Sequence, residues 1–505
     1  MKTTSNQEQD NQKALNLLFK SGVIAFLLGI VGYIIMFFFR LLAARYLGAD
    51  DYGLFSLVET IFGIIAVIAG LGLAQGIPRY IPYYKEKQEL GLLKGYKRFV
   101  FSTGLASSLL FGVALFLLAD TIAGFFNVPE SFGFLLQIVA VAIPLKTING
   151  LLKKTFLAEK DVFYYKFSDK FVEQGLLLVG LGIVWWYELS LLYLVIVFTA
   201  SFAASLLFNA AVYRIKFHKK TTATSTYEKK RWIYFSLPLL LTGMFGYLIS
   251  WSDNLIIGIY LTPAELGIYA VAYSLAKALT FGSSALSAMF LPVVSELFAK
   301  KNYQGIQDVF KKTTSWVFGA TLPAFLIILF YTEEILYLLF GAEYVTGSLA
   351  LTILAIGMLI NLATVFATSL LTMDEKTKPL FYVKILVTTI NVLLNIALIP
   401  LIGIEGAAIT SAISITLQSI IFLYLSRKYH AFSFDYTYLT KFVAAGIPAI
   451  LLSVLLFELT IPFYAKLVLA GAAYIGLYTL FLILLKTFDE EDKRILQLVF
   501  KKLRG

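Results

Sequence analysis

The sequence predicts an all-α, polytopic membrane protein of about 14 transmembrane helices, built from two parallel six-helix repeats and a C-terminal helix pair. Hydrophobic residues make up 59% of the 505 residues and charged residues only 14%, which is far from a soluble composition. The apolar residues fall in blocks of about 20, the length that crosses a bilayer core of roughly 30 Å. Basic residues gather on one predicted side, and two segments of the chain resemble each other.

Breaks between the hydrophobic blocks define the individual helices. Residues 1–20 are polar, and the apolar run after them is too long for a cleavable signal peptide, so we expect the first span to stay in the protein. Turn residues such as Pro263 and Gly403 mark short connections. The predicted spans are 19–46, 53–77, 99–119, 132–152, 167–186, 190–213, 232–260, 266–292, 313–331, 346–372, 380–400, 404–426, 441–460 and 464–486.

The distribution of charge predicts that both termini are cytoplasmic. With the N-terminus inside, 36 of the 42 lysines and arginines fall in the N-terminal segment, the inside loops or the C-terminal tail. Acidic residues such as Asp50, Asp51 and Glu130 fall outside. This positive-inside pattern predicts a multi-pass protein of the cell membrane. It also explains the net charge of +11 without a nucleic-acid partner.

An internal repeat predicts the arrangement of the helices. Residues 29–98 and 243–312 align without a gap, with 13 of 70 positions identical, including glycines, a proline and tyrosines. Six helices separate matching positions, and an even number preserves their orientation in the membrane. Parallel repeats of this kind occur in transporters whose two lobes rock around a central site. We expect lobes at 1–225 and 226–430, a helix pair in 431–486, and a cytoplasmic amphipathic tail at 487–505.

Four segments resemble one known family. They are Arg45–Ser56, Asp253–Tyr273, Pro292–Lys312 and Gly403–Ala408. Together they are similar to the polysaccharide transporters, the lipid-linked oligosaccharide flippases of the multidrug/oligosaccharidyl-lipid/polysaccharide exporter superfamily, and the resemblance covers essentially the whole chain. It implies a V-shaped pair of lobes that moves a polyprenyl-diphosphate-linked oligosaccharide to the outer leaflet by alternating access. It further implies that the last two helices guide the lipid tail, and that glycosyltransferases or a polymerase of the same pathway are partners.

Lys277 is the sharpest candidate for binding the diphosphate. It lies about 11 residues, or roughly 16 Å, into the predicted helix 266–292, near the bilayer centre. A charge at that depth costs at least about 2.5–3.5 kcal/mol, so a function is the default interpretation. Polar residues at spacings of three and four share its helix face, and we expect this stripe to line the lumen; they are Tyr269, Tyr273, Thr280, Ser284 and Ser287. The alternative is a structural ion pair between Lys277 and a carboxylate on another helix.

Three further charged residues are predicted to act in binding, gating or coupling. Arg40 and Asp253 lie at similar depth in the outer third of their helices, where we expect an inter-lobe ion pair. Arg40 is also a candidate contact for the substrate; the alternative is that it reaches the outer headgroups. Glu59 aligns with Tyr273 in the repeat and is expected to face the same lumen, where it would bind a coupling H⁺ or Na⁺.

Other polar groups within the predicted helices are given structural interpretations. Lys146 lies near a cytoplasmic helix end, where the positive-inside rule explains it better than capture of the diphosphate. Asp169 and Glu173 begin a helix, whose dipole favours acids there. Asn391 and Asn395 share a helix face, so we expect hydrogen bonds between helices, with sugar contact as the alternative.

The sequence offers little support for an enzyme. His218 and His430 have no partner cluster, and no Walker A loop is present, so we expect no catalysis, no cofactor and no metal site. Tyr80, Tyr83 and Tyr84 are interpreted as an interfacial aromatic belt. The nearest alternative function is a drug/cation antiporter of the same superfamily, and a membrane-embedded transferase is a more distant one. The C-terminal helix pair, which is predicted in addition to the two six-helix repeats, favours the flippase over the antiporter.

Overall fold

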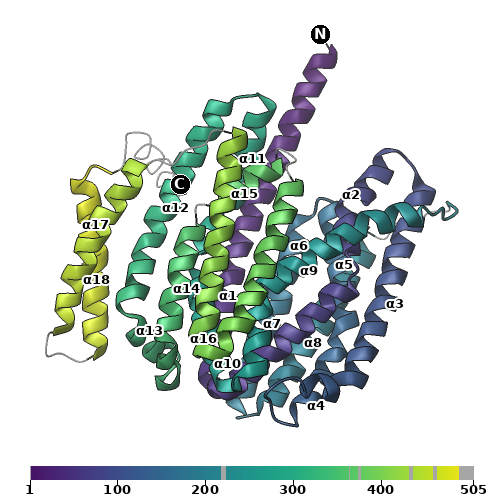
Figure 1. Cartoon of the computed structure of the whole chain (residues 1–505). Coiled ribbons are helices and arrows are strands. Elements are labelled where there is room, and N and C mark those ends of the chain that lie inside the picture. The colour runs from purple at the N-terminus through teal and green to yellow at the C-terminus, as the bar shows by residue number, and fades with distance from the viewer. Residues whose placement is uncertain are drawn as a thin grey trace. The chain divides into compact units, whose positions relative to one another are not determined.

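A computed structural model describes residues 2–217, 223–362, 364–373, 377–430, 436–458 and 463–487 (Figure 1). Throughout these ranges the regular structure is helical, which confirms the all-α prediction. The predicted amphipathic tail beyond residue 487 lies outside the described residues. The α-helices are α1 (Lys2–Ala69), α2 (Leu73–Glu86), α3 (Leu90–Ala123), α4 (Phe132–Ala140), α5 (Ala142–Ala158), α6 (Val162–Phe167), α7 (Gln174–Trp186), α8 (Leu191–Val212), α9 (Lys229–Tyr260), α10 (Pro263–Ala278), α11 (Phe281–Ala299), α12 (Tyr303–Phe330), α13 (Thr332–Leu339), α14 (Ser348–Asn361), α15 (Thr364–Met373), α16 (Thr377–His430), α17 (Tyr436–Val454) and α18 (Phe463–Leu484).

Nine helices in the described part of the chain are long and apolar enough to cross a membrane. The span Phe26–Ala69 has 44 residues, which as one straight helix would measure about 66 Å, twice the thickness of a bilayer core. Gly48 breaks this helix with φ 75°, and Gly403 breaks α16 with φ 66°. Beyond the second break, the backbone at Gly406 packs against Leu398, so the chain of α16 folds back on itself. These helices confirm a multi-pass membrane protein, while the count of 14 stays a prediction.

One predicted helix, 266–292, is interrupted in the structure. Helix α10 ends at Ala278 and α11 begins at Phe281. The Thr280 hydroxyl donates a 2.8 Å hydrogen bond to the carbonyl of Lys277. Side-chain bonds of this kind compete with the helical ladder, which gives a physical reason for the break. The prediction of one continuous helix is therefore wrong at this point.

The chain forms two compact units. Their boundaries divide α10 and α16 and lie away from residue 225, so the predicted division into two sequence lobes stays a prediction. The first unit contains Met1–Ser274, Tyr337–Ala350 and Lys378–Ser414. The second contains Leu275–Leu336, Leu351–Thr377 and Ile415–Gly505.

An aromatic cluster forms part of the core of the first unit, where α2 packs on α3, α5 and α9. Tyr80, Tyr84, Tyr96 and Trp232 are all buried in it. The Trp232 indole donates to the Tyr84 hydroxyl over 2.9 Å, and that hydroxyl donates to Glu228 over 2.9 Å. Burial raises the pKa of Tyr84 to about 12. The interfacial-belt prediction is therefore wrong for Tyr80 and Tyr84, because aromatic packing withdraws both rings from the surface.

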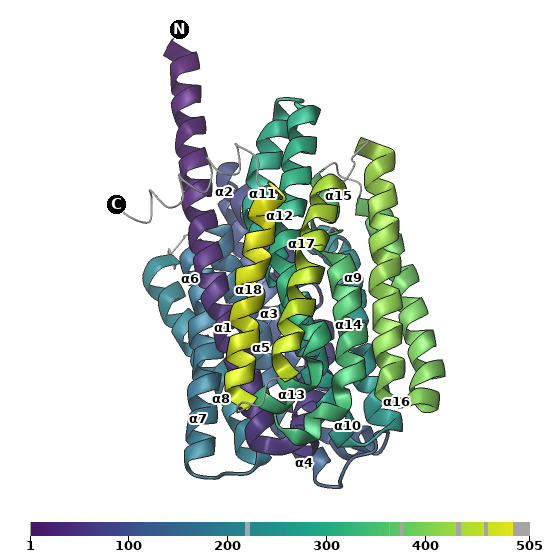
Figure 2. The same cartoon turned by 90° about the vertical axis from the view of Figure 1, so that its left-hand side faces the viewer.

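The second unit has its own apolar core between α11, α12 and α15, which includes Phe290, Phe310 and Phe366. At the C-terminal end of the described chain, α17 and α18 pack side by side (Figure 2). The pair also contacts α12, where the Tyr478 hydroxyl donates to the Gly319 carbonyl over 2.8 Å. This pair corresponds to the two helices predicted at 441–460 and 464–486.

Candidate functional site

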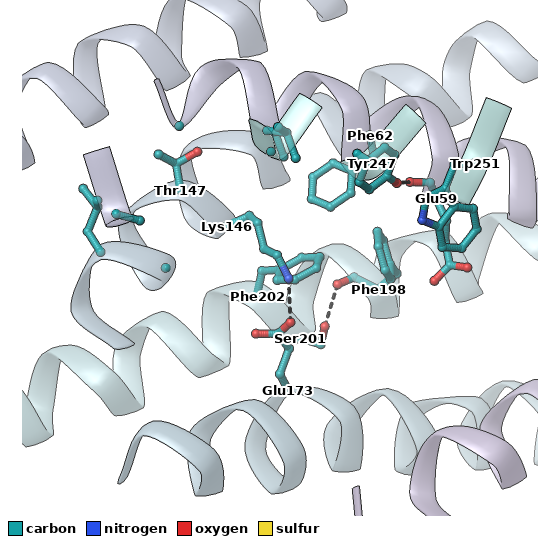
Figure 3. A pocket seen from close by; sticks show the side chains of 18 of the residues that line it. Glu59, Phe62, Lys146, Thr147, Glu173, Phe198, Ser201, Phe202, Tyr247 and Trp251 are labelled. Atoms are coloured by element: carbon teal, nitrogen blue, oxygen red, sulfur yellow. Dashed lines mark hydrogen bonds and ion pairs between the residues drawn. The ribbon is translucent and has the colours of Figure 1, made fainter. Parts of the chain in front are cut away.

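A cavity of about 490 Å³ lies within the first unit (Figure 3). Its wall combines residues of α1, α2, α5, α7, α8 and α9 with the turn between α6 and α7. Four charged residues line it, in a part of the chain that is otherwise strongly apolar: Arg40, Glu59, Lys146 and Glu173. Aromatic rings form much of the remaining wall, from Phe62, Phe198, Phe202, Tyr247 and Trp251. Charges that share an aromatic-walled chamber are suited to orienting a polar ligand.

Arg40 and Glu59 form an ion pair at one part of this wall. The Arg40 Nη2 and Glu59 Oε2 atoms are 3.6 Å apart, and both side chains are largely shielded from solvent. The two residues lie on either side of the Gly48 break, so the kink in α1 brings them together. The expected pair between Arg40 and Asp253 is not formed, because the nearest carboxylate to Arg40 comes from the same kinked helix. Arg40 lines the cavity.

Glu173 receives three donors at the opposite part of the wall. Lys146 Nζ lies 2.8 Å from its Oε1, and Lys153 Nζ lies 2.8 Å from its Oε2. The Asn149 amide also donates to Oε2, over 3.3 Å. Lys153 is buried and contacts Asp169 as well, over 2.9 Å. Glu173 therefore keeps two donors even when Lys146 turns away from it. Figure 3 shows Lys146 reaching across to Glu173 beside the ring of Phe202.

The acids of this cluster lie on a π-helical turn, Ser168–Glu173, between α6 and α7. Such turns widen the helix by one residue and often mark functional positions. Hydrogen bonds to α8 hold the turn in place, because Asn209 donates to the Ser168 hydroxyl over 2.6 Å. The helix-dipole interpretation of Asp169 and Glu173 is thus replaced by ion pairs with lysines.

Sequence reasoning missed this network, although a signal was present. Lys146, Asn149 and Lys153 have spacings of three and four, which place them on one helix face. Asp169 and Glu173 are four residues apart, so they also share one face of the next helical segment. Matching a basic face with an acidic face would have suggested their contact. The positive-inside rule accounts for the number of lysines, but it gives no reason for Lys146 to face a cavity.

Asp253 belongs to a separate buried site. Its side-chain oxygens accept hydrogen bonds from Tyr269 and Ser411, and from the Asn395 amide over 2.6 Å. Asn391 donates to Ser414 over 3.2 Å. The predicted interhelical hydrogen bonding of Asn391 and Asn395 is confirmed. Tyr269 points to Asp253, so this member of the predicted stripe is engaged within the protein.

The remaining members of the stripe span the break in the helix. Lys277 is exposed and Tyr273 is half-buried on α10, while Thr280 lies in the turn before α11. The side chain of Ser284 lies outside the described residues. Lys277 and Thr280 belong to the second unit, whereas the residues that line the cavity belong to the first. Their role in binding the substrate stays a prediction.

Comparisons with known proteins connect this architecture to transporters. The chain is similar to the probable low-salt glycan biosynthesis flippase Agl15 of Haloferax volcanii, with 25% identity over 421 residues, covering 83% of this chain and 86% of the relative. It is also similar to the capsular polysaccharide biosynthesis protein CapF of Staphylococcus aureus, with 25% identity over 243 residues, covering 48% of this chain and 60% of the relative.

Solved structures share the fold. The lipid II flippase MurJ in an inward closed conformation matches with a TM-score of 0.71 and 15% identity, over 92% of this chain and 99% of that one. An inward-facing multidrug resistance MATE family transporter of the MOP superfamily matches with a TM-score of 0.65 and 14% identity, over 81% of this chain and 98% of that one.

Two family patterns match the sequence itself. The MatE pattern matches residues 238–397. The pattern described as polysaccharide biosynthesis protein matches residues 18–298, which is more than half of the chain. The chain therefore belongs to the polysaccharide biosynthesis protein family, in agreement with the resemblance seen in its sequence motifs.

Proposed function

We propose that this protein is a flippase that moves a polyprenyl-diphosphate-linked oligosaccharide from the cytoplasmic to the outer leaflet of the cell membrane. Membership of the polysaccharide biosynthesis family, a relative named as a glycan flippase and the fold of a lipid II flippase all support this function. The observation that carries it is the cation-bearing cavity of the first unit. Glycosyltransferases would supply the lipid-linked substrate, and a polymerase or transferase would consume it outside.

The charge of the cavity favours an anionic ligand over a cationic drug. Arg40 is paired with Glu59, so this pair contributes no net charge. Glu173 is shared between Lys146 and the buried Lys153, so three groups carry one negative and two positive charges. The four charged residues that line the cavity balance one another, and Lys153, Asp169 and Lys170, outside the lining, add one net positive charge. A diphosphate would be attracted to this positive charge in a low-dielectric surrounding, where attraction is much stronger than in water.

Lys146 is the residue that binds the diphosphate in this proposal. Its ammonium group lies 4.5 Å from the centre of the Phe202 ring, and its side chain is the most exposed of those in the network. When the diphosphate arrives, Lys146 exchanges Glu173 for a phosphate oxygen. Lys153 and Asn149 keep the abandoned carboxylate paired, which avoids the several kcal/mol that an unpaired buried charge costs.

The residues predicted from the sequence complete the proposed cycle. Lys277, with Tyr273, Thr280 and Ser284, would contact the diphosphate or the glycan. Glu59 would bind a coupling H⁺ or Na⁺ in the cavity, where it would compete with Arg40. Asp253 would gate or couple through its buried hydrogen bonds. Both termini would be cytoplasmic, as the positive-inside pattern predicts.

A drug/cation antiporter is the second candidate, because the MatE pattern also matches residues 238–397. Purified protein in liposomes distinguishes the two functions. A flippase translocates a fluorescent polyprenyl-diphosphate sugar, which becomes accessible to a reagent on the opposite side. Lys146→Met should lower this translocation rate about tenfold or more, because the charge-assisted hydrogen bond to the diphosphate is lost. Lys146→Arg should retain most of the rate, because arginine keeps such a bond.

The matched control for this experiment is Lys154→Met. Lys154 lies on the same helix, outside the cavity, with its ammonium group 5.6 Å from the Tyr165 ring. We expect its variant to translocate at the rate of the unchanged protein. Extrusion of a cationic dye, without translocation of the lipid-linked sugar, would reject the flippase and favour the antiporter.

A further inference from the structure

Two glycines at equivalent positions of the sequence repeat lie against each other in the first unit. Gly53 and Gly267 are 214 residues apart, the same offset that aligns residues 29–98 with 243–312. A methyl group placed on Gly53 would lie 1.8 Å from the carbonyl oxygen of Pro263 and 2.9 Å from the nitrogen of Gly267. Pro263 is itself the repeat partner of Ala49.

The reverse contact has nearly the same dimensions. A methyl group on Gly267 would lie 2.0 Å from the carbonyl oxygen of Ala49 and 3.0 Å from the nitrogen of Gly53. Each distance matches its counterpart within 0.2 Å. Two equivalent segments that contact each other reciprocally must meet on the axis that relates them. The local two-fold axis of the repeats therefore passes between Gly53 and Gly267.

This contact is made by backbone alone, at the beginnings of two helical segments. Gly53 follows the Gly48 break in α1, and Gly267 lies in the first turns of α10. Both glycines are buried. Small residues permit such close approach between membrane helices. The three nearest atoms that an added methyl group would meet at each glycine all belong to the backbone.

A second contact lies beneath the glycines, on the side of the cavity. The Asn254 amide donates a 3.1 Å hydrogen bond to the Thr60 hydroxyl, and both side chains are buried. Thr60 is adjacent to Glu59, which lines the cavity. Gly53 is six residues before Glu59, or about 9 Å along a helix. The glycine contact and this hydrogen bond thus form two layers between the cavity and the end of the unit that the positive-inside pattern assigns to the outside.

We propose that the Gly53–Gly267 contact and the Thr60–Asn254 hydrogen bond form the outer gate of the transport passage. The gate is closed in this structure, and it must open on the repeat axis for the cavity to reach the outer face. The inference needs alternating access, as in the proposed function, but it is independent of the cargo. A contact on the axis is a natural gate, because rocking of the two repeats separates equivalent segments there symmetrically.

The natural chain has no cysteine, so a single reporter thiol tests the gate directly. Ala66→Cys places a thiol in the cavity wall, and a membrane-impermeant maleimide is added outside intact cells. Gly53→Ala or Gly267→Ala forces the backbones apart, and labelling of the thiol should rise about tenfold, because overpacking destabilises only the closed state. The matched control is Gly246→Ala on α9, where an added methyl group meets nothing within 4 Å. Labelling in this control should stay at the reporter's own rate.

Unchanged labelling of the thiol in glycine variants whose thermal midpoint equals that of the reporter protein would overturn the proposed gate.

A second experiment applies if the glycine variants fail to fold. Thr60→Cys and Asn254→Cys, combined with the reporter, are oxidised to a disulfide across the lower layer. External labelling of the reporter should then fall to background and return on reduction. If the disulfide forms and labelling continues at the same rate, the contact is static packing and the proposal is wrong. Both readouts need no substrate, so their failure is separate from failure of the flippase assay.

Discussion

At the scale of single residues, the cavity depends on how charges are shared. Glu173 has donors on both oxygens, and Lys153 in turn divides its charge between Glu173 and Asp169. Such sharing makes each ion of the network replaceable by a neighbour. A cation that is held by a carboxylate with other partners can leave it at low cost, which is what a binding site for a transient anion requires.

Lys153 is expected to be the structural centre of this network. Lys153→Met removes a buried cation between two acids, and breaking buried pairs costs about 3–5 kcal/mol. We expect a clearly lower thermal midpoint of the purified protein, measured by intrinsic fluorescence. Adding Asp169→Asn should recover part of the loss, because one uncompensated carboxylate disappears. A midpoint unchanged by Lys153→Met would show that the network adds little stability.

Lys277 allows a separate prediction, based on its predicted position near the bilayer centre. Lys277→Ala should abolish export of the glycan in cells while leaving the amount of protein in the membrane intact. The reason is that a cation at this depth is costly unless it binds an anion during transport. Export is measured as surface polysaccharide, with Lys154→Ala as the control. Normal export would remove Lys277 from the site and leave the cavity of the first unit as the binding region.

At the scale of elements, irregular backbone positions the site. The Gly48 break brings Arg40 beside Glu59, and the π-helical turn Ser168–Glu173 presents its acids to α5. The break at Thr280 separates Lys277 from the helix after it. In a membrane, each such interruption needs partners for the freed backbone groups, so interruptions are retained where they serve a site.

Gly48 is expected to be irreplaceable for conformational reasons. Its backbone has φ 75° and ψ 174°, a region that residues with a side chain adopt only at a cost of about 1–3 kcal/mol. Gly48→Ala should therefore lower the thermal midpoint and weaken the Arg40–Glu59 pair, with reduced transport. Gly246→Ala is the matched control, because its site has room for a methyl group. Equal midpoints for the two variants would contradict the strain argument.

At the scale of the whole molecule, topology determines which way the substrate moves. The predicted orientation is tested with single cysteines in the cysteine-free chain. Asp51→Cys, in the connection between the first two spans, should react with an impermeant maleimide in intact cells. Lys94→Cys, at the start of α3, should react only after the cells are permeabilised. The opposite pattern would invert the assignment of sides and with it the direction of transport.

Much of the fold was predictable because hydrophobic length and charge asymmetry are local properties. The blocks of apolar residues predicted the helices, and the polar spacing of Asn391 and Asn395 predicted their interhelical hydrogen bonds. The candidate site was less predictable. The predicted ion pair between Arg40 and Asp253 was wrong, because similar depth in the membrane does not determine which way each side chain points from its helix. Lys146 was attributed to the positive-inside rule because its partner, Glu173, lies on another helix.

The sequence by itself determined that this is a multi-pass helical membrane protein with an internal repeat, because bilayer thickness and charge leave few alternatives. It also contained the motifs of the polysaccharide biosynthesis family. Only the tertiary structure decided which residues meet: Arg40 with Glu59, Lys146 and Lys153 with Glu173, and Gly53 with Gly267. The physical reason is that periodicity places a residue on a face of its own helix, whereas the partner of that face depends on helix rotation, on kinks and on packing between distant segments.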